Sequence, residues 1–185
     1  MKIYCLGDSL TAGYGVAPDE SWVALLGRRG NNEWIGGGIS GDTSVGMLTR
    51  LQSVVIPQKP DFVIWMGGYN DILLTGSADL AKASAMAFIN HCAAAGIRPV
   101  IGIPFLLQRV AAPWDRLCDW EACRPVLEAY IDWLHRFCEA ARLRHIDFQE
   151  AGAFLLPDGM HPTAEGHRIM AEAVVRCPCF REDRL

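Results

Sequence analysis

The chain has 185 residues, of which 51% are hydrophobic and 21% charged, a balance typical of a globular protein with one sizeable core. Its formal net charge is −4, without a run of like charges, which argues against a nucleic-acid partner. No apolar stretch reaches membrane-spanning length and no leader segment precedes the first strand, so we expect a single domain over 1–185, without stable membrane insertion, in the cytoplasm.

Seven cysteines are present. Three of them fall in apolar patterns and are predicted to be core thiols, namely Cys5, Cys92 and Cys138. The pairs Cys118/Cys123 and Cys177/Cys179 have suggestive spacings, but neither matches the ligand spacing of a zinc site. We therefore expect reduced thiols and no metal ion.

The first predicted strand, 3–6, leads directly into the stretch Gly7-Asp8-Ser9. Gly7 permits a sharp turn, and Ser9 then stands past the carboxyl end of the strand, where ligands bind in open parallel sheets. A serine here is a candidate nucleophile. The alternative is a plain strand-to-helix turn in which Asp8 or Ser9 caps the helix.

Apolar runs and helical periodicity then alternate along the chain. Strands are predicted at 3–6, 33–36, 62–66, 98–104 and 143–148, and helices at 21–26, 43–51, 78–96, 121–141 and from 163 onward. Residues 36–38 are expected to form a glycine loop, and 177–185 a loose tail. No phosphate-loop or dinucleotide motif accompanies the glycines, so no cofactor is expected.

This alternation predicts a three-layer α/β/α fold. Its five-stranded parallel sheet is expected to have the strand order 2-1-3-4-5, which is a flavodoxin-like arrangement. Its switch point falls between the strands that end before Ser9 and before Asn70. These two side chains are therefore expected to face each other across one crevice.

Near the other end of the chain, Asp158 and His161 lie three residues apart in a turn-like segment. A serine needs a base to take its proton, and a histidine base needs a group that fixes its tautomer. One loop can supply both. Asp8 and Asp71 are rival carboxylates that we expect to bond backbone N–H groups, while His167 is a rival base without an acidic partner nearby.

Four blocks together resemble the SGNH hydrolase superfamily, often called GDSL lipases and esterases. They are Gly7-Asp8-Ser9, Gly38-Ile-Ser-Gly41-Asp-Thr-Ser44, Gly67-Gly-Tyr-Asn70-Asp71 and Asp158-Gly-Met-His161. The second block looks closest to bacterial thioesterase/lysophospholipase members. The resemblance implies an SGNH hydrolase fold, with Ser9, Asp158 and His161 as catalytic residues, and with an oxyanion hole formed by Ser9, Gly41 and Asn70.

The sequence thus predicts a serine hydrolase that cleaves small-molecule acyl esters or thioesters through an acyl-enzyme on Ser9. Residues 105–120 lack periodicity, and a long loop in a compact domain is often functional, so Phe105 and Leu107 are expected to bind the acyl chain. Two alternatives stay open, a carbohydrate O-deacetylase with the same chemistry and a non-catalytic flavodoxin-like binding module. The oligomeric state is not determined by the sequence.

Overall fold

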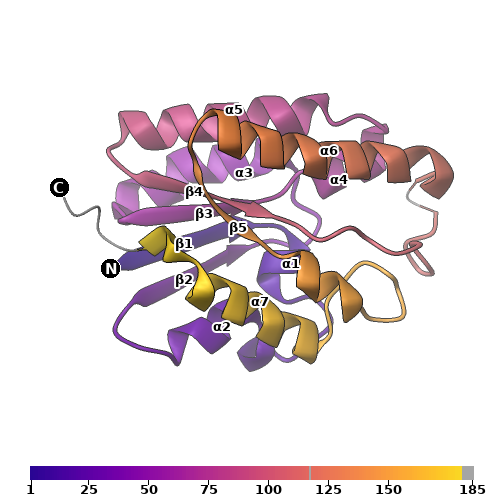
Figure 1. Cartoon of the computed structure of the whole chain (residues 1–185), viewed down its shortest axis with the longest axis horizontal. Helices are drawn as coiled ribbons and strands as arrows, with labels where there is room; N and C mark the ends of the chain where they lie inside the picture. The colour runs from indigo at the N-terminus through magenta and orange to yellow at the C-terminus, as the bar shows by residue number, and fades with distance from the viewer. Residues whose placement is uncertain (117, 181–185) are drawn as a thin grey trace.

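The computed structural model describes residues 1–116 and 118–180 and has three layers, with helices on both faces of one sheet (Figure 1). The strands are β1 (Lys2–Gly7), β2 (Glu33–Gly38), β3 (Phe62–Met66), β4 (Arg98–Ile103) and β5 (Arg144–Asp147). The helices are α1 (Ser9–Ala12), α2 (Trp22–Gly27), α3 (Ser44–Arg50), α4 (Tyr69–Thr75), α5 (Asp79–Ala94), α6 (Trp120–Ala140) and α7 (Ala164–Arg176).

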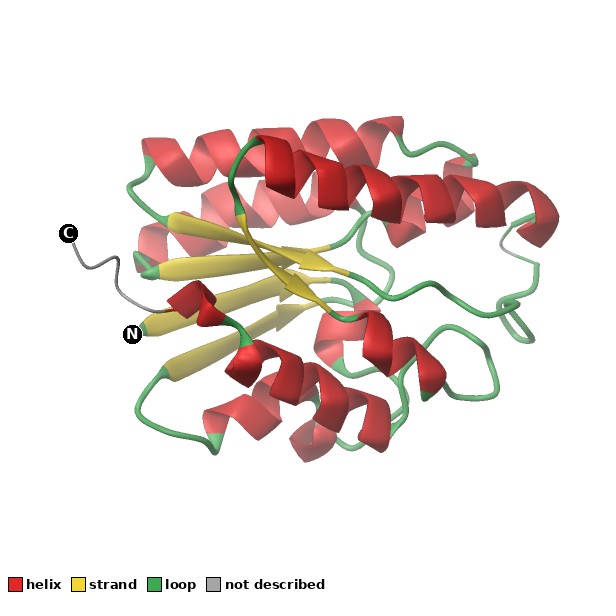
Figure 2. Cartoon of the chain, viewed as in Figure 1, coloured by secondary structure: helices red, strands yellow, loops and turns green. Residues whose placement is uncertain are grey.

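The five strands are parallel and follow the order β2-β1-β3-β4-β5, which confirms the predicted topology. Helices α3 to α6 cover one face, and α1, α2 and α7 cover the other (Figure 1). β3 is buried throughout, as a central strand covered on both faces must be. All arrowheads point to the side of the molecule where the long loops gather (Figure 2).

Strand β2 is longer than the sequence predicted, because Gly37 and Gly38 belong to it and pair with Leu6 and Gly7 of β1. A Cβ on Gly37 would lie 2.1 Å from the Tyr4 ring, and one on Gly38 would lie 2.2 Å from the backbone nitrogen of Ala12. These glycines therefore allow close packing within a strand and do not form the expected flexible loop.

The predicted helix over 78–96 is observed as α5, but it is preceded by the separate helix α4, which the sequence pattern did not predict. Gly76, with φ +71°, ends α4 and separates the two helices. Ser21 and Thr163 cap α2 and α7, since their side chains accept hydrogen bonds from the N–H groups of Ala24 and Gly166.

The prediction of a loose tail covered residues 177–185, of which 181–185 lie outside the described part of the chain. The described residues of this segment are packed against the body of the protein. Residues 178–180 form a short helical turn, and the Phe180 ring packs edge-on against Phe62 and Trp34 with centroids 5.2 and 5.5 Å away. Cys177 and Cys179 are joined by a disulfide, so the expectation of reduced thiols is wrong for this pair.

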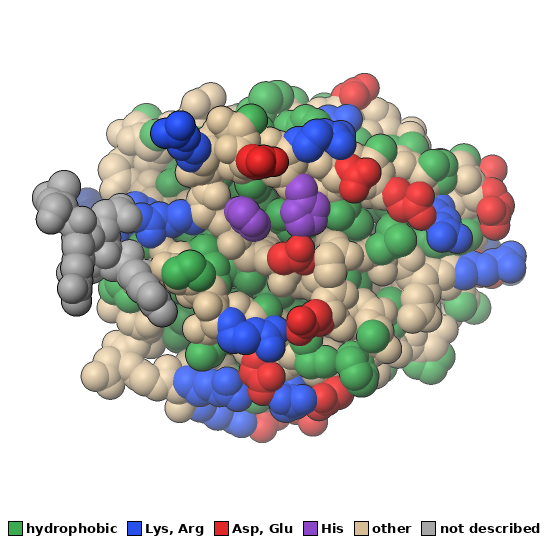
Figure 3. All heavy atoms as spheres, in the orientation of Figure 1, with side chains coloured by type: hydrophobic (Ala, Val, Ile, Leu, Met, Phe, Trp, Pro, Cys, Tyr) green, Lys and Arg blue, Asp and Glu red, His purple; other side chains and the backbone are tan. Residues whose placement is uncertain are grey.

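The remaining five cysteines are free thiols, and the three predicted core thiols are all buried. None of the helices in the described part of the chain combines the length and apolarity needed to cross a bilayer. On the face shown in Figure 3, acidic and basic side chains lie interspersed among apolar ones.

Candidate active site

The turn that follows β1 places Ser9 at the edge of the sheet where the loops gather. Gly7 ends the strand without a side chain, because a Cβ there would lie 2.1 Å from Thr11 Oγ1. Asp8 caps helix α1 by accepting a 3.0 Å hydrogen bond from the N–H of Leu10. Ser9 is the first residue of α1, so the strand-to-helix turn is observed, and its capping residue is Asp8.

The loop before α7 brings Asp158 and His161 to Ser9. His161 Nδ1 lies 2.6 Å from Asp158 Oδ2, and His161 Nε2 lies 3.0 Å from Ser9 Oγ. Asp158 Oδ1 also accepts hydrogen bonds from the N–H groups of Met160 and His161, at 2.9 and 3.0 Å. The carboxylate is thus held on one side by the turn and directs its other oxygen at the imidazole.

This geometry fixes the tautomer of the imidazole, because a proton on Nδ1 that is donated to Asp158 leaves Nε2 free to accept from Ser9. Partial burial by itself raises the pKa of Asp158, but the hydrogen bonds from the side chain and N–H of His161 and from Met160 lower it below its usual value. The carboxylate therefore stays ionised beside the histidine, which can act as a general base towards the Ser9 hydroxyl.

The rival groups have other partners, as the sequence suggested. Asp71 is buried and accepts from the N–H and the hydroxyl of Ser44, each at 2.9 Å. His167 is fully buried in α7, its Nδ1 accepts from the N–H of Trp22 at 3.4 Å, and burial lowers its pKa to about 4. It is therefore neutral near pH 7 and bonded away from Ser9.

Asp8 is almost fully buried, and this burial raises its pKa to about 7, a shift that the hydrogen bond from Leu10 opposes. The folded protein thus holds the Asp8 proton more tightly than the unfolded chain does. Its contribution to stability is complete below about pH 4 and is lost as the pH rises to about 7.

Asp8→Asn is expected to remove this pH dependence, since an asparagine can keep the hydrogen bond from Leu10 without ionising. Relative to the wild type, the variant should gain stability between pH 4 and pH 8, by at most roughly 4 kcal/mol at about 1.4 kcal/mol per pKa unit. Urea unfolding of both proteins at pH 4, 6 and 8 measures the difference. A difference that is the same at all three pH values would contradict the ionisation of a buried Asp8.

Ser9, Gly41 and Asn70, the three residues expected to form an oxyanion hole, line one cavity and each carry an N–H donor. The described backbone hydrogen bonds leave the N–H groups of Ser9 and Gly41 without a protein acceptor. Gly41 has φ +80°, a conformation that side chains disfavour. The amide nitrogen of Asn70, in the first turn of α4, donates one hydrogen bond to the backbone oxygen of Asp42 at 2.9 Å and keeps a second N–H.

A cavity of about 300 Å³ opens beside these groups. Its lining includes four residues expected from the sequence, namely Ser9, Gly41, Asn70 and His161. It also includes four that the sequence reasoning missed, namely Tyr14, Ser40, Trp114 and Met160. Ser40 and Met160 lie inside the sequence blocks that were recognised, and Tyr14 lies five residues after Ser9, so their closeness in sequence to the predicted site residues was the available signal.

Tyr14 and Trp114 form an aromatic wall over the histidine. The Tyr14 ring centroid lies 4.5 Å from that of His161 and 5.9 Å from that of Trp114. Trp114 belongs to the loop that follows β4. Two backbone hydrogen bonds tie this loop to the His161 loop, from the N–H of Gln108 to the oxygen of Gly159 and from the N–H of Ala111 to the oxygen of Asp158. The aperiodic stretch therefore does contribute to the site, through a residue that the sequence did not single out.

Phe105 does not have the predicted position, because it is fully buried in the core and does not line this cavity. Its backbone oxygen accepts a 2.5 Å hydrogen bond from the Tyr69 hydroxyl, and its Cβ fills the space left by Gly152. Leu107 is also buried, but it lines a much smaller cavity of about 10 Å³ behind Ser9. No cluster of three or more metal-ligating side chains occurs among the described residues.

A model of the GDSL-like Lipase/Acylhydrolase family matches residues 5–169. The chain belongs to this family. Thioesterase 1/protease 1/lysophospholipase L1 of Escherichia coli (strain K12) is 28% identical over 177 residues, which cover 90% of this chain and 78% of that protein. Esterase TesA of Pseudomonas aeruginosa is 39% identical over 71 residues, only 36% of this chain and 35% of that protein.

The fold of this GDSL-family protein is shared with solved structures. An acetyl xylan esterase from Geobacillus stearothermophilus superimposes with a TM-score of 0.73 at 23% sequence identity, covering 95% of this chain and 93% of that chain. At this identity the likeness concerns the fold. The family match, in contrast, spans all four of the sequence blocks that surround the cavity.

Proposed function

We propose that this protein hydrolyses carboxylic esters or thioesters through an acyl-enzyme on Ser9. The observation that supports this best is the hydrogen-bonded series from Asp158 through His161 to Ser9, with distances of 2.6 and 3.0 Å, at the wall of a cavity. The family and the names of the relatives, which include an esterase and a thioesterase/lysophospholipase, support the same class of reaction.

The proposed reaction has two steps. Ser9 Oγ attacks the acyl carbonyl while His161 takes the hydroxyl proton and then gives it to the leaving alcohol or thiol. Water, activated by the same histidine, then releases the acid from Ser9. Asp158 orients His161 and stabilises its charged form. The N–H groups of Ser9, Gly41 and Asn70 would stabilise the negative oxygen of both tetrahedral intermediates.

Two kinds of substrate fit this chemistry. The rings of Tyr14 and Trp114 give the cavity an apolar wall suited to an acyl chain. The acetyl xylan esterase with the same fold keeps a carbohydrate acetate as the second candidate. The expected location in the cytoplasm stays a prediction.

A panel of p-nitrophenyl and CoA esters of graded acyl length, together with acetylated carbohydrates, tests the proposal. We expect hydrolysis of the esters or thioesters, with a preference for acyl groups longer than acetyl. Activity confined to carbohydrate acetates would show that the protein is a carbohydrate O-deacetylase and not a hydrolase of longer acyl esters. No hydrolysis of any of these substrates by folded protein would contradict the proposed function.

Loss of the Asn70 amide is expected to slow the reaction at the transition state. Asn70→Ala should lower kcat by about 10² to 10³ with a smaller effect on KM, as expected for a missing oxyanion donor. Steady-state kinetics on the best ester of the panel measures this. Asn90→Ala, at an exposed position of α5, is the matched control and should keep the wild-type kcat. An unchanged kcat in Asn70→Ala would remove Asn70 from the mechanism.

The acyl-length preference is expected to depend on Trp114. Trp114→Ala widens the cavity, so the acyl length with the highest kcat/KM should increase, with about 0.8 kcal/mol gained for each further CH₂ that is buried. Trp133→Ala removes a half-buried tryptophan that stacks on Phe137 in α6, and it should leave the preference unmoved. An identical length profile in Trp114→Ala and the wild type would exclude Trp114 from acyl binding.

Phe105 and Leu107 provide the contrast on the same loop. Since Phe105 is fully buried in the core, Phe105→Ala should cost about 3 to 5 kcal/mol of stability. Leu107 borders Ser9 only through the small inner cavity. Its replacement by alanine would enlarge that cavity and extend the space available to an acyl chain, which the same length profile detects.

A further inference from the structure

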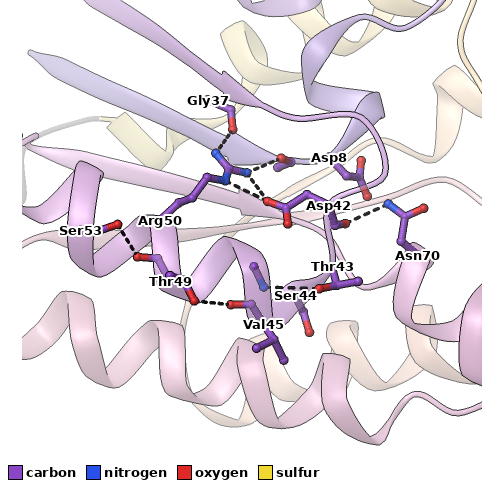
Figure 4. A network of polar contacts seen from close by, with 12 residues as sticks. Asp8, Gly37, Asp42, Thr43, Ser44, Val45, Thr49, Arg50, Ser53 and Asn70 are labelled. Atoms are coloured by element: carbon purple, nitrogen blue, oxygen red, sulfur yellow. Dashed lines mark hydrogen bonds and ion pairs between the residues drawn. The ribbon is translucent and has the colours of Figure 1, made fainter.

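Arg50, the last residue of α3, joins three segments at the edge of the site. Its Nε and Nη2 donate to Asp42 Oδ2 at 2.8 and 2.7 Å. Its Nη1 donates to the backbone oxygen of Gly37 at 2.6 Å, and Nη2 also donates to that of Gly7 at 3.0 Å. Figure 4 shows the guanidinium between the ends of two strands and the Asp42 side chain.

Two of these partners, Gly7 and Asp42, lie close in the chain to an N–H donor around Ser9. Gly7 ends the strand two residues before Ser9, and Asp42 directly follows Gly41. The backbone oxygen of Asp42 accepts the hydrogen bond from Asn70. One guanidinium is thus connected, through its partners, to all three donors.

The loop that carries Gly41 has few other restraints on this side. The N–H of Ile39 donates to the oxygen of Gly7 and the N–H of Asp42 donates to the oxygen of Ile39, both at 3.1 Å. The paired side chains of Arg50 and Asp42 are 18% and 14% exposed, so their ion pair is shielded from solvent more than a surface pair would be. A planar guanidinium can make all four contacts at once, whereas a lysine ammonium has only three donors at one point.

We propose that Arg50 is a positioning residue for oxyanion stabilisation, which rests on the proposed function. It holds Asp42 so that the Gly41 N–H and the Asn70 amide keep their places relative to Ser9. Arg50 is not among the residues that line the cavity, and it acts through the two donors without touching substrate. Misplacement of such donors by a fraction of an ångström to an ångström weakens the transition state more than it weakens substrate binding.

Kinetics of two variants test this. Arg50→Met should lower kcat by up to about 10²-fold while KM changes by less than about threefold, the pattern of a transition-state effect. Arg50→Lys should recover part of the loss. Arg28→Met is the control, because Arg28 pairs with Asp19 on the exposed surface, and it should match the wild type. A loss in KM alone, or wild-type kcat in Arg50→Met, would overturn the proposal.

A double variant separates positioning from general loss of structure. If Arg50 acts by placing Asn70 and Gly41, Arg50→Met should cost much less kcat in the Asn70→Ala background than in the wild type. Equal fold-changes in both backgrounds would mean that Arg50 does not act through these donors. Thermal unfolding identifies variants that do not fold. If Arg50→Met does not fold, Arg50→Lys, which keeps the charge beside Asp42, replaces it in the comparison with Asn70→Ala.

A further measurement does not depend on ester hydrolysis. In ¹⁵N NMR spectra, the Asn70 side-chain amide, identified by its loss in Asn70→Ala, should shift in Arg50→Met and in Arg50→Lys but not in Arg28→Met. An unshifted Asn70 signal in folded Arg50→Met would overturn the positioning role. If the wild-type protein hydrolyses no ester while the Asn70 signal shifts in both Arg50 variants, the result counts against the proposed function alone.

Discussion

Ser9→Ala is expected to abolish hydrolysis, with kcat falling by a factor on the order of 10⁶, as when a serine hydrolase loses its nucleophile. The reason is that His161 Nε2 lies 3.0 Å from Ser9 Oγ, so the alanine variant has a base without a nucleophile to activate. The fold should not change, because Ser9 does not supply the cap of α1, which comes from Asp8.

Covalent capture gives the same prediction independently of a substrate. An organophosphonate esterase probe should form one adduct, located on Ser9 by peptide mass spectrometry, and should inactivate the enzyme. Ser40→Ala is the matched control, since Ser40 also lines the cavity but lacks the histidine. Labelling that persists in Ser9→Ala, or that maps to Ser40, would assign the nucleophile elsewhere.

Asp158→Asn is expected to lower kcat by about 10⁴, the effect of losing the carboxylate that fixes the histidine tautomer. An asparagine can donate an N–H to His161 Nδ1. The imidazole proton then resides on Nε2, which faces Ser9, so Nε2 can no longer accept the Ser9 proton. Near-wild-type kcat in correctly folded Asp158→Asn would show that the carboxylate is not the orienter. Circular dichroism and thermal unfolding establish the folded state of the variant.

The pH profile separates His161 from Asp8. His161 must be neutral to accept the Ser9 proton, so kcat/KM should fall on the acidic side as the histidine takes up a proton. Burial raises the pKa of Asp8 to about 7, and Asp8 directly precedes Ser9, so its ionisation is the alternative source of a pH dependence. The acidic limb should therefore persist in Asp8→Asn. If Asp8→Asn loses the limb, or is more damaging than Asp158→Asn, the carboxylate roles are misassigned.

The non-catalytic binding module that the fold alone allowed predicts none of these effects. A flavodoxin-like sheet has the same crevice whatever it does there. What distinguishes the two readings is the position of side chains: a serine, a histidine and a carboxylate in hydrogen-bond contact, with free N–H donors beside them. Binding of an ester or thioester by the folded wild-type protein without any turnover would favour the binding module.

The sequence by itself determined the layers, the strand order and the four segments that meet at the site. Alternating strand and helix patterns predict a doubly wound parallel sheet and favour the order 2-1-3-4-5, in which the carboxyl ends of β1 and β3 meet at the switch point. Asp158 and His161 were also predictable as a pair, because three residues in a turn keep them together whatever the rest of the chain does. These are properties of local periodicity and short sequence distance.

Only the tertiary structure decided which side chains line the cavity and which hold its walls. Phe105 and Trp114 lie on one aperiodic loop, and which of them is buried in the core depends on contacts with distant residues such as Tyr69 and Gly159. Arg50 gave no signal in the sequence, because its partners come from the ends of two different strands and from Asp42. A single guanidinium can satisfy such acceptors only after the fold has brought each of them within 3.0 Å of one of its nitrogens, which periodicity along one element does not encode.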